Sequence, residues 1–184
     1  MVNHSNQTDS GSYYDSIAKG YNELHSEEQL RKLELIGKEL KTDEKLNGFL
    51  DVNGSFLDVG CGSGISTGFF SAKYRVGIDP SRKLINIAVG HYPMIEFFIG
   101  NAEEMKFKDK SFDTVISLTA IQNFDNIEKG LLEMRRVCKK NFILTFLKKS
   151  PKNEQITELI RKHFYVIKTI EEDKDMIFFC KNLF

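Results

Sequence analysis

Residues 56–64, Phe-Leu-Asp-Val-Gly-Cys-Gly-Ser-Gly, form an apolar run that carries one acid and then has glycine at every second position. This pattern predicts a buried strand that ends in a tight turn. Glycine suits such a turn because it reaches backbone angles that other residues avoid and leaves the main chain open to a ligand. A second apolar run, residues 74–78, ends at Asp79, about 20 residues further on, where an acid can bind ribose hydroxyls. The two strand ends together predict a nucleoside site.

Size and composition limit the other possibilities. The 184 residues predict one domain that buries its core without disulfides or metals. Lys plus Arg equal Asp plus Glu at 26 each, so the chain has no overall charge excess of the nucleic-acid-binding kind. Cys61, Cys138 and Cys180 share no short spacing and the histidines are scattered, so we expect reduced thiols and no metal site. No membrane span or signal peptide is predicted, and we expect a cytoplasmic protein.

From Ser55 onward, strand-like and helix-like segments alternate, as in a parallel sheet with crossover helices. The last two strand-like segments are separated by a short charged stretch, which predicts an antiparallel hairpin. The fold class that follows is α/β, a doubly wound, mostly parallel, seven-stranded Rossmann-like sheet that ends in an antiparallel hairpin. Expected strands are 55–60, 74–79, 95–99, 112–118, 141–147, 164–170 and 176–180, and expected helices are 64–73, 81–91, 126–138 (capped by Asp125, with Cys138 on its apolar face) and 151–163 (opened by Pro151).

Two further helices are predicted before the first strand. Residues 1–11 are rich in Ser, Asn, Asp and Gly and are expected to be disordered. Residues 13–21 show helical spacing, and a longer helix opens at Ser26 with the capping-box spacing to Gln29. Its apolar face is expected to hold Leu30, Leu33, Ile36 and Leu40. We expect residues 12–184 to form a single domain in which the helices over 12–46 act as a lid on the ligand site.

Further motifs follow the glycine turn in order. Gly77 to Ser81 end the second strand, Gly100 to Glu103 end the third, and a strand with Phe112 to Ile116 comes next. Together with residues 56–64, this set resembles the class I S-adenosylmethionine-dependent methyltransferases over roughly the whole chain after residue 11. A dinucleotide-binding loop has a third glycine where this chain has Ile65, which disfavours a nicotinamide-dependent oxidoreductase.

The resemblance implies S-adenosylmethionine as the cofactor and assigns contacts to it. Gly60 and Gly62 would pack against the methionine part, with Asp58 near its amino group. Asp79 would accept hydrogen bonds from both ribose hydroxyls, since a carboxylate can accept from two donors at once. Cys61 is expected in the loop for its fit rather than for catalysis. The remaining expected cofactor contacts are Tyr14, Pro80 beside the adenine, Asn101, Ala102 and Glu103 at the base edge, and Leu118.

Residues 117–124 follow the fourth strand and are expected to face the methyl acceptor. Gln122 and Asn123 are the candidates that orient it, and Phe124 can stack on a flat ring, although capping and core packing explain these residues equally well. The segment has no Asn-Pro-Pro-Tyr motif, which disfavours amide or adenine amino methylation. Because methyl transfer from a sulfonium depends largely on positioning, a dedicated base is not required.

A closer resemblance concerns the acceptor and a partner. Three segments look like those of the guanine-N7 methyltransferase of eukaryotic small-subunit ribosomal RNA and its archaeal relatives. They are residues 117–122, 56–66 and 77–81. This implies an RNA base as acceptor, and residues 131–170, with ten basic and three acidic side chains, offer electrostatic support. A small-molecule acceptor, or a non-catalytic cofactor-binding assembly factor, are the alternatives. The resemblance also implies a small zinc-binding activator protein that pairs with 94–99 as an edge strand.

Overall fold

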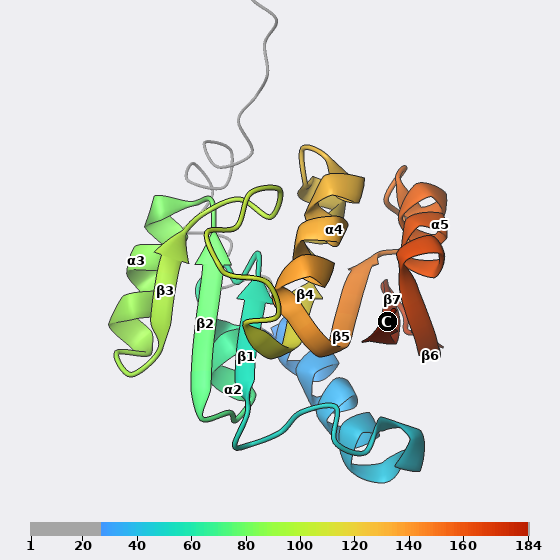
Figure 1. Ribbon diagram of the computed structural model, residues 1–184, viewed down its shortest axis with the longest axis horizontal. Helices are drawn as coiled ribbons and strands as arrows, with labels where there is room; N and C mark the ends of the chain where they lie inside the picture. Colours follow the sequence, from blue (N-terminus) through green and yellow to red (C-terminus); the bar gives the residue numbers. More distant parts are fainter. Residues whose placement is uncertain (1–26, 184) are drawn as a thin grey trace, which may run out of the picture.

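A seven-stranded sheet forms the centre of the protein in the computed structural model, which describes residues 27–183. Its strand order is β3-β2-β1-β4-β5-β7-β6, with helices on both faces (Figure 1). Strands β1 to β5 run parallel, whereas β7 lies between β5 and β6 and is antiparallel to both. The predicted fold class is confirmed, including the closing hairpin. The strands are β1 (Ser55–Val59), β2 (Tyr74–Asp79), β3 (Glu96–Ile99), β4 (Phe112–Leu118), β5 (Cys138–Leu147), β6 (Phe164–Glu171) and β7 (Asp175–Asn182).

Helices alternate with the strands after β1. They are α2 (Ile65–Phe69), α3 (Arg82–His91), α4 (Ile127–Val137) and α5 (Asn153–His163), with the short 3₁₀ turns η1 (Glu44–Leu46) and η2 (Ile121–Asn123). Before β1 the chain is helical over residues 27–42. The expected disordered segment 1–11, the helix 13–21 and the cap at Ser26 lie outside the described residues. No helix within residues 27–183 has the length and apolar character needed to cross a membrane.

Two apolar clusters hold the helices against opposite faces of the sheet. Leu131 of α4 and Ile160 of α5 pack on one face, and Ile36 of the 27–42 helix packs on the other. Neighbouring residues of β4 point to opposite faces, so Val115 joins the first cluster and Ile116 the second. Because each fully buried side chain of this kind contributes roughly 1.5–3 kcal/mol, packing rather than helix propensity holds these helices in place.

The helix expected over 64–73 is shorter than predicted. It ends at Phe69 because Phe70 takes up extended backbone angles, with φ −84° and ψ 136°. This turn brings the Phe70 ring into the core, where it is 4% exposed and lies 5.9 Å from the ring of Phe56. Burial of one aromatic ring therefore overrides the continuation of the helix.

Helix α4 differs by one residue at each end from the expected 126–138. Asn126 caps it, with a side chain that accepts a hydrogen bond from the backbone N–H of Lys129 at 3.0 Å. The predicted cap was Asp125, a residue type that caps equally well, so the local pattern could not separate the two. Cys138 is the first residue of β5 rather than the last of the helix, because its backbone pairs with Phe112 of β4.

Of two smaller predictions about helices, one is wrong and the other holds only in part. Pro151 does not open α5, which begins at Asn153 after a turn. In the 27–42 helix, Leu30 is 43% exposed while the side chain of Lys32 is buried. Leu33, Ile36 and Leu40 of the expected face do pack on the second cluster, so the departure is confined to the first turn. The Lys32 side chain is buried in an ion pair described below.

Strand β3 forms one edge of the sheet, as predicted for residues 94–99. Its surroundings are open: Met94 just before it is 92% exposed, and Phe98 and Ile99 are 45% and 47% exposed. Figure 1 shows this strand beside α3 at the margin of the molecule. The edge thus presents apolar side chains together with its outer row of backbone groups.

Candidate active site

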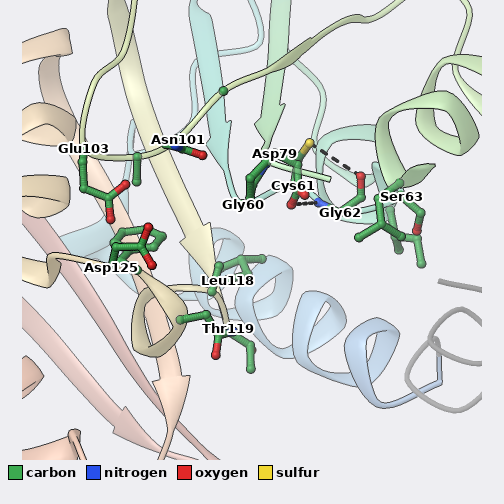
Figure 2. Close-up of a pocket in the computed structure, with 18 of the residues that line it drawn as sticks. Gly60, Cys61, Gly62, Ser63, Asp79, Asn101, Glu103, Leu118, Thr119 and Asp125 are labelled. Carbon is green, nitrogen blue, oxygen red and sulfur yellow. Dashed lines mark hydrogen bonds between the residues drawn. The ribbon is translucent and has the colours of Figure 1, made fainter. Parts of the chain in front are cut away.

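A cleft of about 870 Å³, the open space at its mouth included, lies at the carboxyl ends of β1, β2 and β4 (Figure 2). Parallel α/β sheets bind ligands at this edge, beside the point where the strand order reverses. The volume suits a ligand of nucleoside size. The lining residues are Gln29, Gly60, Cys61, Gly62, Ser63, Ile65, Asp79, Pro80, Leu84, Gly100, Asn101, Ala102, Glu103, Leu118, Thr119, Ala120, Asn123, Phe124 and Asp125.

Asp79 joins the two strand ends that the sequence singled out. Its Oδ2 accepts a hydrogen bond from the backbone N–H of Gly62, and its Oδ1 accepts one from the N–H of Ser81, both at 2.9 Å. The N–H of Gly60 donates to the carbonyl of Ile78 at 2.8 Å. The turn after β1 is therefore tied to the end of β2. Since each carboxylate oxygen has two lone pairs, this arrangement is compatible with further donors from a ligand.

The glycine turn has the geometry that its composition predicts. Gly60, Gly62 and Gly64 have φ values of 76°, 53° and 84°, in the left-handed region that favours glycine. A Cβ on Gly60 would lie 2.4 Å from the Cβ of Ala120, so the segment after β4 touches the turn directly. At Gly62 a Cβ would meet no atom of the described residues within 4 Å, so among these residues the bare backbone is open to a ligand.

Asp58 lies beneath the cleft and is absent from its lining. The carboxyl is fully buried, and its Oδ2 accepts hydrogen bonds from Ser66 Oγ at 2.5 Å and Thr67 Oγ1 at 2.8 Å. Its Oδ1 is buried and has no hydrogen-bond partner among residues 27–183. Burial raises the pKa of Asp58 to about 6, opposed by the two hydroxyls and reinforced by the charge of Asp79. A cation bound above it would compensate this unpartnered oxygen.

Cys61 lines the cleft as a buried thiol. Burial, and after it the charges of Asp58 and Asp79, raise its pKa well above the ordinary value. A Cβ on Gly77 would lie 2.8 Å from its sulfur, so the thiol packs directly on the backbone of β2. A thiol that stays protonated is a poor nucleophile, which agrees with the predicted role in fitting the loop.

Residues 100–103 form one wall of the cleft, continuous with Pro80. Asn101, Ala102 and Glu103 all line it, as expected. Glu103 Oε1 accepts a hydrogen bond from the backbone N–H of Asn126 at 3.1 Å, which ties this loop to the start of α4. Figure 2 shows the side chains of Glu103 and Asp125 on the same side of the cleft.

The structure separates the two residues predicted to orient an acceptor. Asn123 lines the cleft, but Gln122 does not, because its Nε2 turns back and donates to the carbonyl of Thr119 at 2.8 Å. Leu118 lines the cleft, as expected. The prediction for Tyr14 falls outside the described residues.

Sequence reasoning missed several lining residues. Phe124, which was proposed, does line the cleft, although only 8% of it is exposed. Its ring packs on the backbone of Gly130, where an added Cβ would lie 2.6 Å away. Among the lining residues not singled out, Thr119 and Ala120 at least belong to the segment 117–124, which was expected to face the acceptor. For Gln29 no local signal exists, since only the packing of its helix brings it to the cleft. The other missed residues are Ser63, Ile65, Leu84, Gly100 and Asp125.

The charge of the cleft distinguishes between nucleotide ligands. Its described lining contains Asp79, Glu103 and Asp125 and no Lys, Arg or His. These carboxylates repel a pyrophosphate and attract a cation. S-adenosylmethionine carries a sulfonium and an ammonium group, so the residues present fit this cofactor better than a dinucleotide.

Comparison with known sequences agrees with this geometry. Residues 57–146 match the family model described as a methyltransferase domain. The uncharacterized protein MJ1252 of Methanocaldococcus jannaschii is 34% identical over 139 residues, which are 73% of this chain and 49% of that protein. The demethylmenaquinone methyltransferase of Chlorobaculum tepidum is 37% identical over 86 residues, 45% of this chain and 36% of that protein. The chain thus spans less than half the length of these relatives.

Solved structures share the fold over nearly the whole chain. The magnesium protoporphyrin IX methyltransferase of Synechocystis PCC 6803 with bound S-adenosylmethionine aligns with a TM-score of 0.77 at 15% identity, covering 98% of this chain and 100% of that one. A chain from the complex between the Haloferax volcanii Trm112 methyltransferase activator and a protein assigned as a methyltransferase aligns with a TM-score of 0.70 at 16% identity, covering 93% and 98%. At these identities the likeness shows the fold.

Residues 57–146 match the model of a methyltransferase domain, and the strand order and the glycine turn agree with a class I S-adenosylmethionine-dependent methyltransferase. S-adenosylmethionine is the cofactor of this family. The closer resemblance to the ribosomal RNA guanine-N7 methyltransferases stays a prediction.

Proposed function

We propose that this protein transfers the methyl group of S-adenosylmethionine to a small-molecule acceptor. One observation carries the cofactor part: Asp79 braces the glycine turn through Gly62 in a cleft whose described lining is acidic and holds no basic side chain. When bound, the cofactor supplies an electrophilic methyl group on a good leaving group. Positioning can then account for much of the acceleration, up to ~7–11 kcal/mol in well-oriented reactions.

Several residues in and beneath the cleft have binding tasks in this proposal. Asp79 accepts hydrogen bonds from the ribose hydroxyls, while Asn101 and Glu103 meet the edge of the adenine and Pro80 borders its face. The bare backbone of the glycine turn packs against the methionine part. Asp58, whose Oδ1 has no partner in the described part of the chain, lies below as a counter-charge for the ammonium group.

The segment after β4 forms the acceptor side. Leu118 and Ala120 supply an apolar wall that excludes water, and the amide of Asn123 supplies a hydrogen bond that orients the acceptor. Gln122 supports this segment from behind through its bond to the Thr119 carbonyl. No residue in this set is needed as a base if the acceptor atom is already nucleophilic.

Charge favours a small molecule over RNA as the acceptor. Six of the ten basic side chains in residues 131–170 form ion pairs within 3.5 Å, with Lys139 and Lys140 sharing Asp113; the six are Arg136, Lys139, Lys140, Lys148, Lys162 and Lys168. The excess of positive charge counted along the sequence therefore offers little attraction for phosphates. Among the relatives, demethylmenaquinone methyltransferase is named for a small-molecule acceptor.

Transfer of label tests both parts of the proposal. Purified protein is incubated with methyl-labelled S-adenosylmethionine and either a small-molecule extract or bulk RNA, and we expect label in small molecules alone. Label in RNA would overturn the acceptor class and leave the methyl donor intact. Tight cofactor binding without transfer to any fraction would favour the non-catalytic assembly factor instead.

We further propose that the edge strand β3 binds an activator protein. Exposed Phe98 and Ile99 lie beside backbone groups that can pair with another strand. The likeness to a chain from a complex with the Trm112 activator supports this proposal. We expect co-expression with a Trm112-type protein to give a complex that Phe98→Glu abolishes. On the opposite edge, β6, Tyr165→Glu changes a ring that is even more exposed, at 60% against 45% for Phe98, and should leave the complex intact. Loss of the complex in both variants, or in neither, would contradict the assignment.

A further inference from the structure

A buried ion pair lies at the carboxyl edge of the sheet, next to the cleft. Lys32 Nζ is 2.6 Å from Asp175 Oδ2, and the two side chains are 5% and 0% exposed. Lys32 belongs to the 27–42 helix, and Asp175 is the first residue of β7. Because β7 is antiparallel to β5, its beginning lies at the edge where β4 and β5 end.

Both charged groups meet Thr119, the first residue after β4. Lys32 Nζ donates to Thr119 Oγ1, and that hydroxyl donates to Asp175 Oδ1 at 3.1 Å. The backbone N–H of Thr119 is held as well, by Thr145 of β5, through its carbonyl at 3.1 Å and its Oγ1 at 2.8 Å. A helix, two strands and the cleft segment thus converge on one residue.

Thr119 has a backbone conformation that needs this support. Its φ is 57°, in the left-handed region that β-branched residues avoid. Such a conformation persists only where the surroundings enforce it, and it is common at binding sites. Here the enforcing groups are the ion pair on the side chain and Thr145 on the main chain.

The conformation of Thr119 shapes the cleft. Thr119 and Ala120 both line it, and Ala120 fills the space that a side chain on Gly60 would need. The carbonyl of Thr119 also accepts the hydrogen bond from Gln122 within the turn that brings Asn123 to the cleft. If Thr119 relaxed to ordinary backbone angles, the contact with the glycine turn and the start of η2 would both move.

A buried ion pair is a poor means of stabilising a fold, because desolvation offsets the attraction, and an apolar pair of similar size is often as stable or more so. Its position beside a strained cleft residue points to another purpose. We propose that Lys32 and Asp175 are positioning residues that hold Thr119 and Ala120 in the shape that binds S-adenosylmethionine. The inference rests on the proposed function for the identity of this ligand.

Removing both charges together tests the proposal. The double variant Lys32→Met/Asp175→Leu leaves no unpaired buried charge, so we expect an unfolding midpoint equal to or above that of the wild type. Its Kd for S-adenosylmethionine, measured by calorimetry, should be weaker by about ten-fold or more. Lys168→Met is the matched control, since Lys168 pairs with Glu39 and Asp43 at the end of the same helix and none of the three lines the cleft. Its Kd should be unchanged.

Substitutions at Thr119 separate positioning from stability. Thr119→Gly added to the double variant should restore part of the affinity, because glycine adopts the left-handed region without strain. If the double variant does not fold, Thr119→Val breaks the link to the ion pair and should weaken binding, whereas Thr119→Ser, which keeps the hydroxyl, should not. An unchanged Kd in the double variant or in Thr119→Val would overturn the inference. Absence of binding by the wild type would instead overturn the proposed function.

Discussion

The backbone N–H of Gly62 donates a hydrogen bond to Asp79 Oδ2 at 2.9 Å, so the acid that ends β2 holds the turn that ends β1. The two features that stand out along the chain therefore form one structural unit. A ligand that reaches Asp79 also meets the backbone that Asp79 positions. Loss of this carboxylate should for that reason affect both the shape of the turn and its chemistry.

Substitution of Asp79 should weaken cofactor binding. Asp79→Ala removes the acceptor of the Gly62 and Ser81 N–H groups, and leaving such groups unpaired costs about 1–3 kcal/mol each where they are buried. Asp79→Asn keeps one acceptor oxygen and should be the more stable of the two. We expect both to lower affinity for S-adenosylmethionine in calorimetry, with Asp79→Ala the weaker binder. Binding by Asp79→Ala at wild-type affinity would contradict the assignment of the ribose site.

Gly60 should not tolerate a side chain. Its φ of 76° is strained for alanine, and the new Cβ would lie 2.4 Å from that of Ala120. We expect Gly60→Ala to lower the free energy of unfolding by roughly 1–3 kcal/mol and to abolish cofactor binding. Gly90→Ala in α3 is the control: a Cβ there meets nothing within 4 Å, and helical alanine should raise stability by about 0.4–1 kcal/mol. Similar behaviour of the two variants in urea unfolding would argue against the close contact.

Asp58 should make stability depend on pH near neutrality. Burial raises its pKa from 3.8 to about 6, so the folded state favours the protonated carboxyl. The contribution of Asp58 is then fully present below pH 3.8 and is lost as the pH rises through 6, a decrease of about 3 kcal/mol. The measurement is the difference in unfolding free energy between the wild type and Asp58→Asn from pH 4 to pH 7, in which other carboxylates cancel. A constant difference across this range would exclude the raised pKa.

Binding of a cation above Asp58 should reverse this effect. If the ammonium group of the cofactor lies near Oδ1, it stabilises the ionised carboxylate, and binding near pH 6 should release protons. Calorimetry in buffers of different ionisation enthalpy detects that release. We expect proton release on binding to the wild type and none on binding to Asp58→Asn. Equal proton release in both proteins would place the ammonium group elsewhere.

The 27–42 helix should depend on its inner face. Leu33 is 1% exposed, and Leu33→Ala should cost about 2–5 kcal/mol of stability because it leaves a cavity in the core. Leu30 lies one turn earlier and is 43% exposed, so Leu30→Ala should change stability by less than about 0.5 kcal/mol. Urea denaturation of both variants checks that Leu33 is buried and Leu30 exposed, and an equal loss of stability in the two would contradict this.

Most of the cofactor side of the cleft was predictable because it depends on local patterns. Gly60, Gly62, Asp79 and residues 101–103 each follow a strand that an apolar run marks in the sequence. Parallel strands place their carboxyl ends at one edge of the sheet, so residues at those ends must come together. Strand alternation and glycine spacing were sufficient for this part of the site.

The direction of individual side chains was not predictable in the same way. Asp58 is in the expected strand, but it turns toward Ser66 and Thr67 beneath the cleft. Asn126 rather than Asp125 caps α4, since neighbouring residues of equal capping ability differ only in what surrounds them. These choices depend on free energies of packing and hydrogen bonding that a sequence pattern does not contain.

The alternation of strands and helices, the glycine turn and the acid at the end of β2 could all be read from residues close together in the chain. Three features could not be read in this way: the insertion of β7 between β5 and β6, the pairing of Lys32 with Asp175, and the ion pairs of the basic side chains in residues 131–170. Each of these joins groups that are distant along the chain. Their contacts form only when the sheet has assembled and helices cover its faces, so they depend on how the whole domain packs.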